Sequence, residues 1–484
     1  MDPRAKIVVT VGPASGKPSI LRRILKAGAD AIRINLSHGS TDEHRETVGR
    51  IRAISGDLDL HVPVILDLMG PRYRLGRLDE PRSLRRGEKV TIGAAGAAVD
   101  LPLDDAELVE HLKAGDRFLI GDGLVELTVV EEVDGGFVAR VVNGGLVSSR
   151  KGINLPDTDL PFSISRKDRR DIRLAVELGA DYLAASYVGT VDDLTALRKL
   201  ARRAGSEIPL IAKLERARAI EHLHEIVTSA DAVMVARGDL GVEVPLHRVP
   251  VLQKQIIQSG RLHGKPVIVA TQMLESMMTN PRPTRAESSD VANAVFDGAD
   301  ALMLSGETAA GRYPVESVKT MARIMREAET HRWTARGRDR EVRPLANASR
   351  TPGPSDLADV VAAAAVFSTK NLKVKQIVAF SQGGFTARAI ARYRPDTPIC
   401  VLTTEHRVAR RVQLVWGVRP LLLDAGVEHH DEVVDRVDRE LLAAGLARSG
   451  DAIVVLMGVP IRNRPLTNLM RLHRVRRPKR ARSR

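Results

Sequence analysis

Short apolar segments alternate with helical patterns along most of the chain, and this alternation limits the fold more than any other feature. Each apolar segment is only a few residues long, is rich in aliphatic and β-branched residues, and precedes a segment with helical periodicity. Strands of this kind are typical of a parallel sheet covered on both faces, and eight strand–helix units close a (β/α)8 TIM barrel. The eight expected strands are Lys6–Val11, Ala31–Asn35, Pro63–Leu68, Tyr182–Tyr187, Pro209–Glu215, Ala232–Arg237, Pro266–Thr271 and Ala301–Gly306.

Residues 72–154 interrupt this alternation between the third and fourth strands. Helical periodicity nearly vanishes there, and two apolar runs are followed by Asp134-Gly135-Gly136 and by Asn143-Gly144-Gly145, which are hairpin turn signals. We therefore expect an inserted small all-β domain, a β-barrel. Because it leaves and re-enters at the carboxyl ends of barrel strands, where such barrels carry their active sites, we expect it to act as a lid.

Helices and strands alternate again near the carboxyl terminus. A polar segment at 334–355 contains two glycines and three prolines and is predicted to be a linker. Residues 356–472 then predict a doubly wound α/β domain, followed by a basic tail at 473–484. The barrel domain itself is discontinuous. It is expected to comprise residues 1–71 and 155–333.

The charge of the chain raises the question of a polyanionic partner. Lys and Arg (74) outnumber Asp and Glu (60), which gives a net charge of +14. Aromatic residues make up only 3% of the chain and no nucleic-acid recognition pattern occurs, so we expect a solvated tail and no main role in nucleic-acid binding, although polyanion binding through the tail stays an alternative. Seven of the surplus charges lie in the last eleven residues, at Arg474, Arg476, Arg477, Lys479, Arg480, Arg482 and Arg484.

Cysteine usage and hydropathy favour a cytoplasmic protein. The single cysteine, Cys400, has no partner in the chain for a disulfide. The sequence contains no apolar run long enough to cross a bilayer and no secretory signal pattern, so we expect no membrane association.

Charged residues gather where four of the predicted barrel strands end. The period of two in a strand turns Arg33, Asn35 and Ser37 to the same side, and gives Lys213 and Glu215 the same relation. The third strand ends at Asp67, and the sixth ends in Arg237-Gly238-Asp239. Buried charge is costly unless it faces a ligand, so these strand ends predict a catalytic mouth.

Glu215 and Asp239 form an oxygen-only pair that suits Mg²⁺ or another hard divalent ion. Lys213 and Arg33 would then neutralise a phosphoryl group, as phosphoryl transfer requires. The alternative is that Lys213 and Glu215 form a buried ion pair that has a structural role only. Gly238 lets backbone amides approach an anion, but no P-loop sequence occurs in the chain.

With these residues assembled, the chain resembles the pyruvate kinase family from Lys6 to about Leu472. The resemblance implies the same three-part fold, a homotetramer, and transfer of a phosphoryl group from phosphoenolpyruvate to ADP, which gives pyruvate and ATP in glycolysis. It is carried by KIVVTVGPAS, GADAIRINLSHG, SRKGINLP, VMVARGDLGVEVP, KPVIVATQMLESM and PRPTRAESSDVANAVFDGADALMLSGETAAGRYP.

The resemblance also implies roles for individual residues. Glu215 and Asp239 look like the ligands of Mg²⁺ or Mn²⁺, and Lys213 and Arg33 like the cations that hold the transferred phosphoryl group. Thr271 and Ser305 are similar to the family's proton route to the enolate. Residues similar to those that contact the nucleotide phosphates are Asn35, His38, Arg74 and Lys151, and those on the side of the substrate carboxylate are Ala236, Arg237, Gly238, Asp239 and Thr271.

Several positions depart from the family pattern. The family places K⁺ among residues that match Asn35, Ser37, Asp67 and the carbonyl of Leu68, but Arg72 stands here in place of a usual Glu. Because a fixed cation and a bound ion in one small site would repel each other, we expect K⁺ not to be required. Met69, Tyr187 and Gly189 also differ from the usual residues, so a non-catalytic relative of the family is the alternative hypothesis.

The segment that matches the family's sugar-phosphate effector loop reads Ser381-Gln382-Gly383-Gly384-Phe385-Thr386. It keeps the two terminal hydroxyls and lacks the internal basic residues, and the partner loop is replaced by Asn463-Arg464-Pro465. We therefore expect no activation by fructose bisphosphate. Ser381, Gln382, Gly383 and Thr386 remain candidates for binding a sugar monophosphate.

Overall fold

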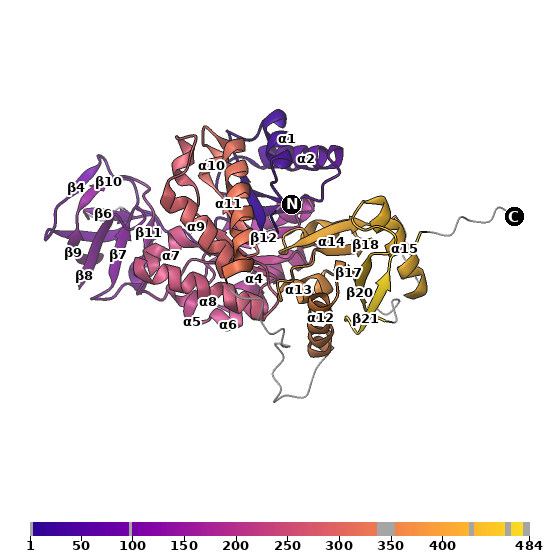
Figure 1. Cartoon of the computed structure of the whole chain (residues 1–484). Helices are drawn as coiled ribbons and strands as arrows, with labels where there is room; N and C mark the ends of the chain where they lie inside the picture. Colours follow the sequence, from indigo (N-terminus) through magenta and orange to yellow (C-terminus); the bar gives the residue numbers. More distant parts are fainter. Residues whose placement is uncertain (1–2, 96–98, 336–353, 425–429, 460–465, 478–484) are drawn as a thin grey trace. The chain divides into compact units, whose positions relative to one another are not determined.

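A closed barrel of eight parallel strands is the main element of the fold, in the order β1-β16-β15-β14-β13-β12-β3-β2 (Figure 1). The computed structural model describes residues 3–95, 99–335, 354–424, 430–459 and 466–477. All eight predicted strands are present, so the predicted barrel is confirmed. The strands are β1 (Lys6–Val11), β2 (Ala31–Asn35), β3 (Val64–Asp67), β12 (Tyr182–Ala185), β13 (Leu210–Leu214), β14 (Ala232–Ala236), β15 (Val267–Ala270) and β16 (Ala301–Leu304).

Helices follow the barrel strands, and local sequence signals fix several of their ends. Ser40 and Thr284 begin two of the helices through reciprocal capping boxes with Glu43 and Glu287, and Gly298 ends one of them with φ 97°. The helices are α1 (Pro18–Lys26), α2 (Thr41–Asp57), α3 (Arg166–Glu177), α4 (Val191–Arg203), α5 (Ala217–Glu221), α6 (Leu223–Ser229), α7 (Arg237–Glu243), α8 (Val249–Leu262), α9 (Arg285–Asp297), α10 (Gly306–Ala309) and α11 (Pro314–Ala335), with short 3₁₀ turns at Leu246–Arg248 and Glu275–Met278.

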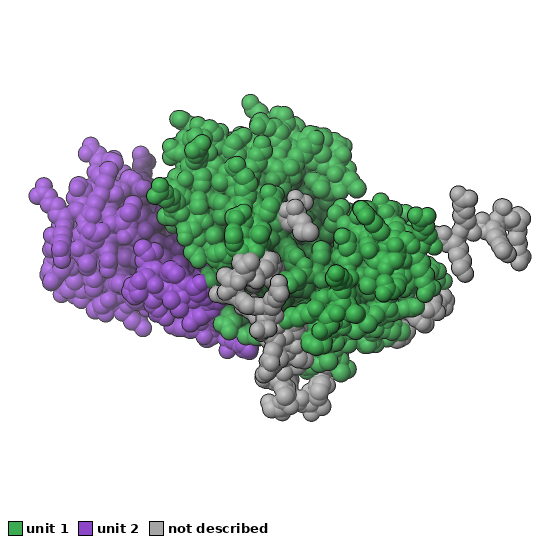
Figure 2. Space-filling view, in the orientation of Figure 1, with its two compact units in different colours: residues 1–66, 178–182, 257–484 green, residues 67–177, 183–256 purple. Residues whose placement is uncertain are grey.

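The chain divides into two compact units (Figure 2). The first unit comprises residues 1–66, 178–182 and 257–484, and the second comprises residues 67–177 and 183–256.

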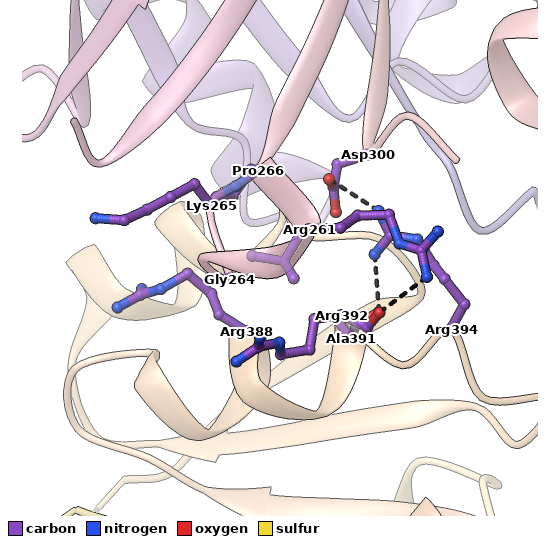
Figure 3. Close-up of a pocket in the computed structure, with 10 residues that line it drawn as sticks. Arg261, Gly264, Lys265, Pro266, Asp300, Arg388, Ala391, Arg392 and Arg394 are labelled. Atoms are coloured by element: carbon purple, nitrogen blue, oxygen red, sulfur yellow. Dashed lines mark hydrogen bonds and ion pairs between the residues drawn. The ribbon is translucent and has the colours of Figure 1, made fainter. Parts of the chain in front are cut away.

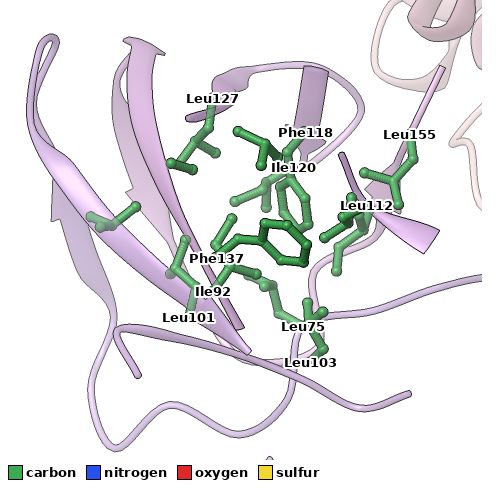
Figure 4. Packing of buried hydrophobic residues seen from close by; sticks show 14 of the residues in the cluster. Leu75, Ile92, Leu101, Leu103, Leu112, Phe118, Ile120, Leu127, Phe137 and Leu155 are labelled. Atoms are coloured by element: carbon green, nitrogen blue, oxygen red, sulfur yellow. The ribbon is translucent and has the colours of Figure 1, made fainter. Parts of the chain in front are cut away.

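The lid (residues 72–154) belongs to the second unit and is all-β, with a six-stranded sheet in the order β11-β7-β8-β9-β5-β6 and a two-stranded sheet of β10 and β4. Its own core includes Phe118, Ile120, Leu127 and Phe137 (Figure 4). The elements are β4 (Arg82–Leu84), β5 (Lys89–Ala94), β6 (Leu101–Leu103), a 3₁₀ turn (Ala106–His111), β7 (Arg117–Ile120), β8 (Val125–Val133), β9 (Gly136–Asn143), β10 (Gly145–Val147) and β11 (Ile153–Asn154).

One of the two predicted hairpins is present and the other is not. Asp134-Gly135-Gly136 joins the antiparallel strands β8 and β9. The prediction at Asn143-Gly144-Gly145 is wrong, because β10 leaves this sheet and pairs with β4. A Cβ at Gly144 would lie 2.3 Å from the carbonyl oxygen of Leu84, so glycine permits a close approach between backbones here.

The carboxyl-terminal domain is a five-stranded sheet in the order β19-β18-β17-β20-β21 with helices on both faces. The doubly wound prediction is thus confirmed, but the antiparallel edge strand β21 was not predicted. The predicted linker lies mostly outside the described residues, as do Asn463-Arg464-Pro465 and the end of the basic tail. The elements are α12 (Pro354–Asn371), β17 (Val374–Phe380), α13 (Phe385–Ala391), β18 (Ile399–Thr403), α14 (His406–Val412), β19 (Val418–Leu422), α15 (His430–Ala443), β20 (Ala452–Met457) and β21 (Leu469–Arg474).

Three Gly-Ala-Asp sequences of the first unit each stand directly before a barrel strand, and their carboxylates make equivalent hydrogen bonds. Asp30, Asp181 and Asp300 stand just before β2, β12 and β16, and we call them the floor aspartates. One oxygen of each accepts a hydrogen bond from a backbone N–H near the start of another barrel strand. These bonds are Ile7 to Asp30 (2.9 Å), Val64 to Asp181 (2.9 Å) and Val267 to Asp300 (3.1 Å).

The second oxygen of each floor aspartate contacts one short segment of the carboxyl-terminal domain, residues 410–416. The donors are Gln413 Nε2 to Asp30 (2.9 Å), Arg410 Nε to Asp181 (2.8 Å) and the backbone N–H of Trp416 to Asp300 (3.2 Å). The same carboxylates therefore fix strand starts and attach the carboxyl-terminal domain.

Candidate active site

A buried cluster of one ammonium and two carboxylates lies at the carboxyl ends of strands in the second unit. Lys213 Nζ is 2.9 Å from Glu215 Oε1 and 3.4 Å from Asp67 Oδ1. The side chains of Glu215 and Asp67 are 1% exposed and that of Lys213 is 11% exposed. Carboxylate oxygens held in such a buried place suit the binding of an added cation.

Asp239 adds a further carboxylate. It lies in the first turn of α7, directly after β14. Burial raises the pKa of Glu215 to about 7, the charge of Lys213 opposes this rise, and the charge of Asp239 adds to it. A divalent cation would stabilise both carboxylates in their ionised forms.

The donors at this place fit Mg²⁺ or Mn²⁺, because they are oxygens only. Among the described residues no group of three or more His, Cys, Asp or Glu side chains is placed to hold a metal ion. A cation on Glu215 and Asp239 would therefore complete its shell with water and substrate oxygens, which is the usual arrangement for Mg²⁺.

Ser186 belongs to this cluster, and the sequence reasoning missed it. It follows β12, is 3% exposed, and its Oγ lies 2.7 Å from Lys213 Nζ and 2.8 Å from the carbonyl oxygen of Leu68. Since a hydroxyl carries a single proton, Ser186 accepts from Lys213 and donates to Leu68. Its position in the sequence could have indicated a role in the site, because Ser186 is the polar residue at the carboxyl end of a strand that is otherwise apolar.

Two turns of the backbone support the cluster of Lys213, Glu215 and Asp67. Tyr187 has φ 59°, a left-handed conformation that is uncommon for a bulky residue, and its N–H donates to Glu215 Oε2 at 2.6 Å. Gly70 has φ 68°, and a Cβ there would lie 2.9 Å from the carbonyl oxygen of Ser186. The loops after β3 and β12 thus pack against each other, with glycine needed for the contact.

Arg72 lies at the joint between the lid and the barrel part of the second unit. Its Nη2 is 3.8 Å from Asp122 Oδ1, and its charge opposes the rise that burial causes in the pKa of Tyr187. Arg72 and Tyr187 line a small pocket together with Arg216 and Glu243. Replacement of K⁺ by Arg72 stays a prediction, since these contacts do not include the expected K⁺ ligand Asp67.

Gly189, where the family pattern has Arg, is approached by two other arginines. A Cβ at Gly189 would lie 3.4 Å from Arg218 Cδ and 3.7 Å from Arg216 Nη1. The carboxylate of Asp193 lies at the same place and accepts a hydrogen bond from the Gly189 N–H at 2.7 Å, so both charges surround this glycine.

Arg74 and Lys151 come together on the two segments that connect the lid. Arg74 bridges Gly152 in an antiparallel pair, and the N–H of Leu75 donates to the carbonyl of Lys151 at 2.9 Å. The Arg74 guanidinium donates to the carbonyl of Arg150 at 2.9 Å. Two of the four predicted nucleotide contacts, Arg74 and Lys151, thus lie on one pair of hydrogen-bonded segments.

The first unit holds the predicted residues of β2. Arg33 Nη1 donates to Thr10 Oγ1 at 3.1 Å, and Asn35 Oδ1 accepts from the N–H of Ser37 at 3.1 Å. His38 is exposed in the loop that follows.

Thr271 and Ser305 directly follow the paired strands β15 and β16 of the first unit. Thr271 has φ 68°, which is uncommon for a β-branched residue, and its hydroxyl donates to the carbonyl of Ala270 at 2.7 Å. The hydroxyl of Ser305 is buried and has no hydrogen-bond partner among the described residues. An unsatisfied buried hydroxyl is costly, so Ser305 is a candidate for contact with a bound molecule.

Ala236, Arg237 and Gly238 form the junction of β14 and α7 in the second unit. The backbone turns from strand to helix at Ala236, with φ −89° and ψ 79°. The Arg237 guanidinium donates to Gln253 Oε1 at 3.4 Å.

The predicted effector loop precedes α13 in the carboxyl-terminal domain. Ser381 Oγ accepts from the N–H of Gly384 at 3.0 Å, and the hydroxyls of Thr386 and Thr467 lie 2.7 Å apart. Gln382 Oε1 is buried and has no partner among the described residues. Gly383 is exposed between them.

In the part of the chain that the structure describes, no helix combines the length and the apolar character that crossing a membrane requires.

Comparisons with known proteins agree with one another along the chain. Residues 2–318 match the model of the pyruvate kinase barrel domain, and residues 359–473 match that of the pyruvate kinase alpha/beta domain. A pyruvate kinase of Agrobacterium vitis is 43% identical over 97% of this chain and 98% of the relative, and one of Mycobacterium tuberculosis is 41% identical over 98% and 99%. The crystal structure of a pyruvate kinase from Cryptosporidium parvum superposes with a TM-score of 0.90 at 32% identity, over 98% of this chain and 96% of that one. This chain therefore belongs to the pyruvate kinase family.

Proposed function

We propose that this chain transfers the phosphoryl group of phosphoenolpyruvate to ADP, giving pyruvate and ATP as a step of glycolysis. Family membership supports the reaction, and one observation supports the site: the Lys213 ammonium held between Glu215 and Asp67 at the ends of barrel strands. This arrangement provides a fixed positive charge beside carboxylates that suit a divalent cation, which is what phosphoryl transfer needs.

The chain's own residues divide the work in this proposal. Lys213 and Arg33 donate to the oxygens of the transferred phosphoryl group and stabilise the charge that spreads over them. Thr271 and Ser305 carry a proton to a carbon of the enolate that forms when the phosphoryl group leaves phosphoenolpyruvate. Arg74 and Lys151 bind the nucleotide phosphates from the side of the lid. The amides of Ala236, Arg237, Gly238 and Asp239 face the substrate carboxylate.

Glu215 and Asp239 would hold Mg²⁺ or Mn²⁺. The ion would supply charge neutralisation at the phosphate oxygens. We further propose that K⁺ is not required. In this proposal the guanidinium of Arg72 supplies the positive charge in place of K⁺. Three of the four expected K⁺ ligands also have protein donors: Ser186 at the Leu68 carbonyl, Lys213 at Asp67 and the Ser37 N–H at Asn35.

Assembly, regulation and location are further parts of the proposal. The family resemblance supports a homotetramer and a sugar-phosphate effector at Ser381, Gln382, Gly383 and Thr386. The buried thiol of Cys400 supports a cytoplasmic location, where thiols stay reduced.

The decisive experiment is a coupled assay of pyruvate formation from phosphoenolpyruvate and ADP with Mg²⁺. The Lys213→Met variant should lose at least a factor of about 100 in kcat, in the range seen when a charge that stabilises a transition state is removed. Lys199→Met, at an exposed position on α4, is the matched control and should retain full activity. Equal turnover of the Lys213 variant and the wild type would remove the proposed role of Lys213. No turnover in the wild-type protein would support a non-catalytic member of the family instead.

A further inference from the structure

A groove between helices α3 and α4 of the second unit has a volume of about 490 Å³, and we call it the α3–α4 groove. This volume is in the range of sites that bind small molecules, roughly 300–1,000 Å³. The groove includes none of the residues proposed above for catalysis or for the effector loop.

Each of the two helices turns one face toward the groove. The lining positions on α3 follow a spacing of three and four residues, which places side chains on one side of a helix. They are Arg169, Ile172, Arg173, Val176 and Glu177. Positions 200, 203 and 204, at the end of α4, repeat this spacing.

The groove has an apolar bottom and a basic rim. Ile172 is 1% exposed, and Val176 and Leu200 are half-buried, so aliphatic side chains form the bottom. Three exposed arginines form the rim, and we call them the rim arginines. They are Arg169, Arg173 and Arg203.

The rim arginines are not neutralised by the fold. Among the described residues, no carboxylate forms an ion pair with any of them. Their neighbour Arg202, by contrast, pairs with Glu207 at 3.2 Å. Glu177 is the acidic lining residue, so three positive charges stand against one negative charge in the groove. Even with Glu177 subtracted, an excess of two positive charges is left.

Helix stability explains one of the rim arginines but not the other two. Arg203 lies in the last turn of α4, where a cation is favourable. Arg169 lies in the first turn of α3, where a cation is unfavourable, and it repels Arg173 one turn further on. A solvated basic surface is the simplest alternative, but it does not require an open groove with an apolar bottom. Side chains that local physics disfavours are expected at functional sites.

The basic cleft beside Asp300 in the first unit is a contrasting case (Figure 3). Arg394 there pairs with Asp300 at 2.9 Å and donates to the carbonyl of Ala391 at 2.8 Å, so it serves the fold. The space in that cleft is only about 10 Å³, which is the room that one water molecule needs. The α3–α4 groove differs in both respects.

We propose that the α3–α4 groove binds a small organic anion that carries two or more negatively charged groups, such as phosphate or carboxylate, on an apolar body. Guanidinium groups match the geometry of phosphate and carboxylate oxygens, so the rim arginines suit the charged groups. Ile172, Val176 and Leu200 suit the apolar body, because its burial against them removes apolar surface from water.

The size of the groove favours a small molecule over a protein partner. Residues 169–177 span eight helical rises, which is about 12 Å. A stable protein interface usually buries about 800 Å² on each partner, and a groove of this length is too short for that.

Binding of pyrenetetrasulfonate, a fluorescent molecule with four sulfonates on a flat apolar ring system, tests the site in the full-length protein. Fluorescence anisotropy at physiological salt gives the Kd while diffuse charge is screened. Arg173→Gln and Arg203→Gln should each raise the Kd at least about tenfold, because each removes a hydrogen bond between charged groups. Arg170→Gln removes the same charge from an exposed position of α3 outside the groove, and it should change the Kd less than about twofold. Circular dichroism checks that the variants fold.

A second comparison tests the apolar bottom of the groove. Inorganic tripolyphosphate has similar charge and no apolar body, so calorimetry should show that it binds at least about tenfold more weakly than pyrenetetrasulfonate. Val176→Thr keeps the size of the side chain and adds a hydroxyl. It should raise the Kd of pyrenetetrasulfonate at least about threefold and leave that of tripolyphosphate unchanged.

The proposal is overturned if Arg170→Gln weakens binding as much as Arg173→Gln does, or if tripolyphosphate binds as tightly as pyrenetetrasulfonate. A polyglutamate peptide that binds more tightly than either anion would also overturn it, in favour of an acidic segment of a partner protein. Loss of binding in Lys213→Met would place the fluorescent anion in the proposed catalytic site instead. All of these measurements report binding and not turnover, so this proposal and the proposed function fail separately.

Discussion

The Lys213 ammonium lies 2.7 Å from the Ser186 hydroxyl, which in turn contacts the carbonyl of Leu68 at 2.8 Å. Lys213 also contacts Glu215, so its nitrogen is held from two sides. The geometry makes Ser186 a positioning residue, which acts on the phosphoryl group only through Lys213.

Ser186→Ala should lower kcat by roughly 10- to 100-fold, because a hydrogen bond to a charged group contributes about 1.5–3 kcal/mol. The KM for phosphoenolpyruvate should change little, since the hydroxyl aligns Lys213 for the transfer step. Ser186→Thr keeps the hydroxyl and should recover part of the activity. Steady-state kinetics of the three proteins measure this split. A loss of thermal stability with unchanged kcat would show that Ser186 has a structural role only.

Removal of a carboxylate should weaken binding of the divalent cation. Asp239→Asn or Glu215→Gln should raise the Mg²⁺ concentration for half-maximal activity by at least about tenfold, because each removes one charged oxygen ligand. Calorimetric titration with Mn²⁺ measures the same effect without turnover. Asp192→Asn, on the exposed start of α4, is the control. Unchanged Mn²⁺ affinity in both active-site variants would contradict this assignment.

Monovalent ions should have little effect on the wild-type enzyme. Activity in K⁺ and in a bulky organic cation at equal ionic strength should agree within about twofold, because the proposed site already contains fixed positive charge. Arg72→Glu should make activity depend on K⁺, since it replaces that charge with a carboxylate. Dependence of the wild type on K⁺ would refute the proposal.

Glu243 should make stability depend on pH. Burial raises its pKa from 4.5, against the hydrogen bond from Asn154 Nδ2 at 3.1 Å. The folded protein therefore keeps this proton to a higher pH than the unfolded chain does. The cost of ionising Glu243 is absent below about pH 4.5 and grows as pH rises through the folded-state pKa.

Glu243→Gln removes this charge and keeps an acceptor for Asn154. The free energy of unfolding of the variant, relative to wild type, should therefore increase between about pH 4.5 and pH 8. Urea denaturation across this range, at saturating Mg²⁺, measures the difference. A difference that is constant with pH, or that favours wild type at pH 8, would contradict the expected sign.

The barrel was predictable from sequence because its strands are buried on both faces and so carry an unbroken apolar signal. The edge strand β21 escaped prediction for the opposite reason. Residues of Leu469–Arg474 are mostly exposed or half-buried and include two arginines, so nothing in the sequence separates them from the basic tail. The false hairpin at Asn143 arose because glycine there serves a close approach to Leu84, and not a two-residue turn.

The charged site residues were predictable because burial of Lys213, Glu215 and Asp67 costs free energy unless these residues face a ligand. Ser186 was not predictable, because burial of a single serine costs little free energy. Its role becomes visible only when the fold places it beside Lys213. The floor aspartates were also missed. Their Gly-Ala-Asp repeats are visible in the sequence, but each role depends on a strand start and on residues 410–416, which are distant in the chain.

The floor aspartates have a consequence for cutting this protein into pieces. A fragment that stops at residue 335 would keep Asp30, Asp181 and Asp300 but lose every donor that residues 410–416 provide. Asp300 would also lose its ion pair with Arg394, whereas Asp30 would keep Lys6 and Asp181 would keep Arg52. A barrel fragment without the carboxyl-terminal domain should therefore be less stable than the barrel in the whole chain, and a shortened protein made for the study of catalysis should retain residues 410–416.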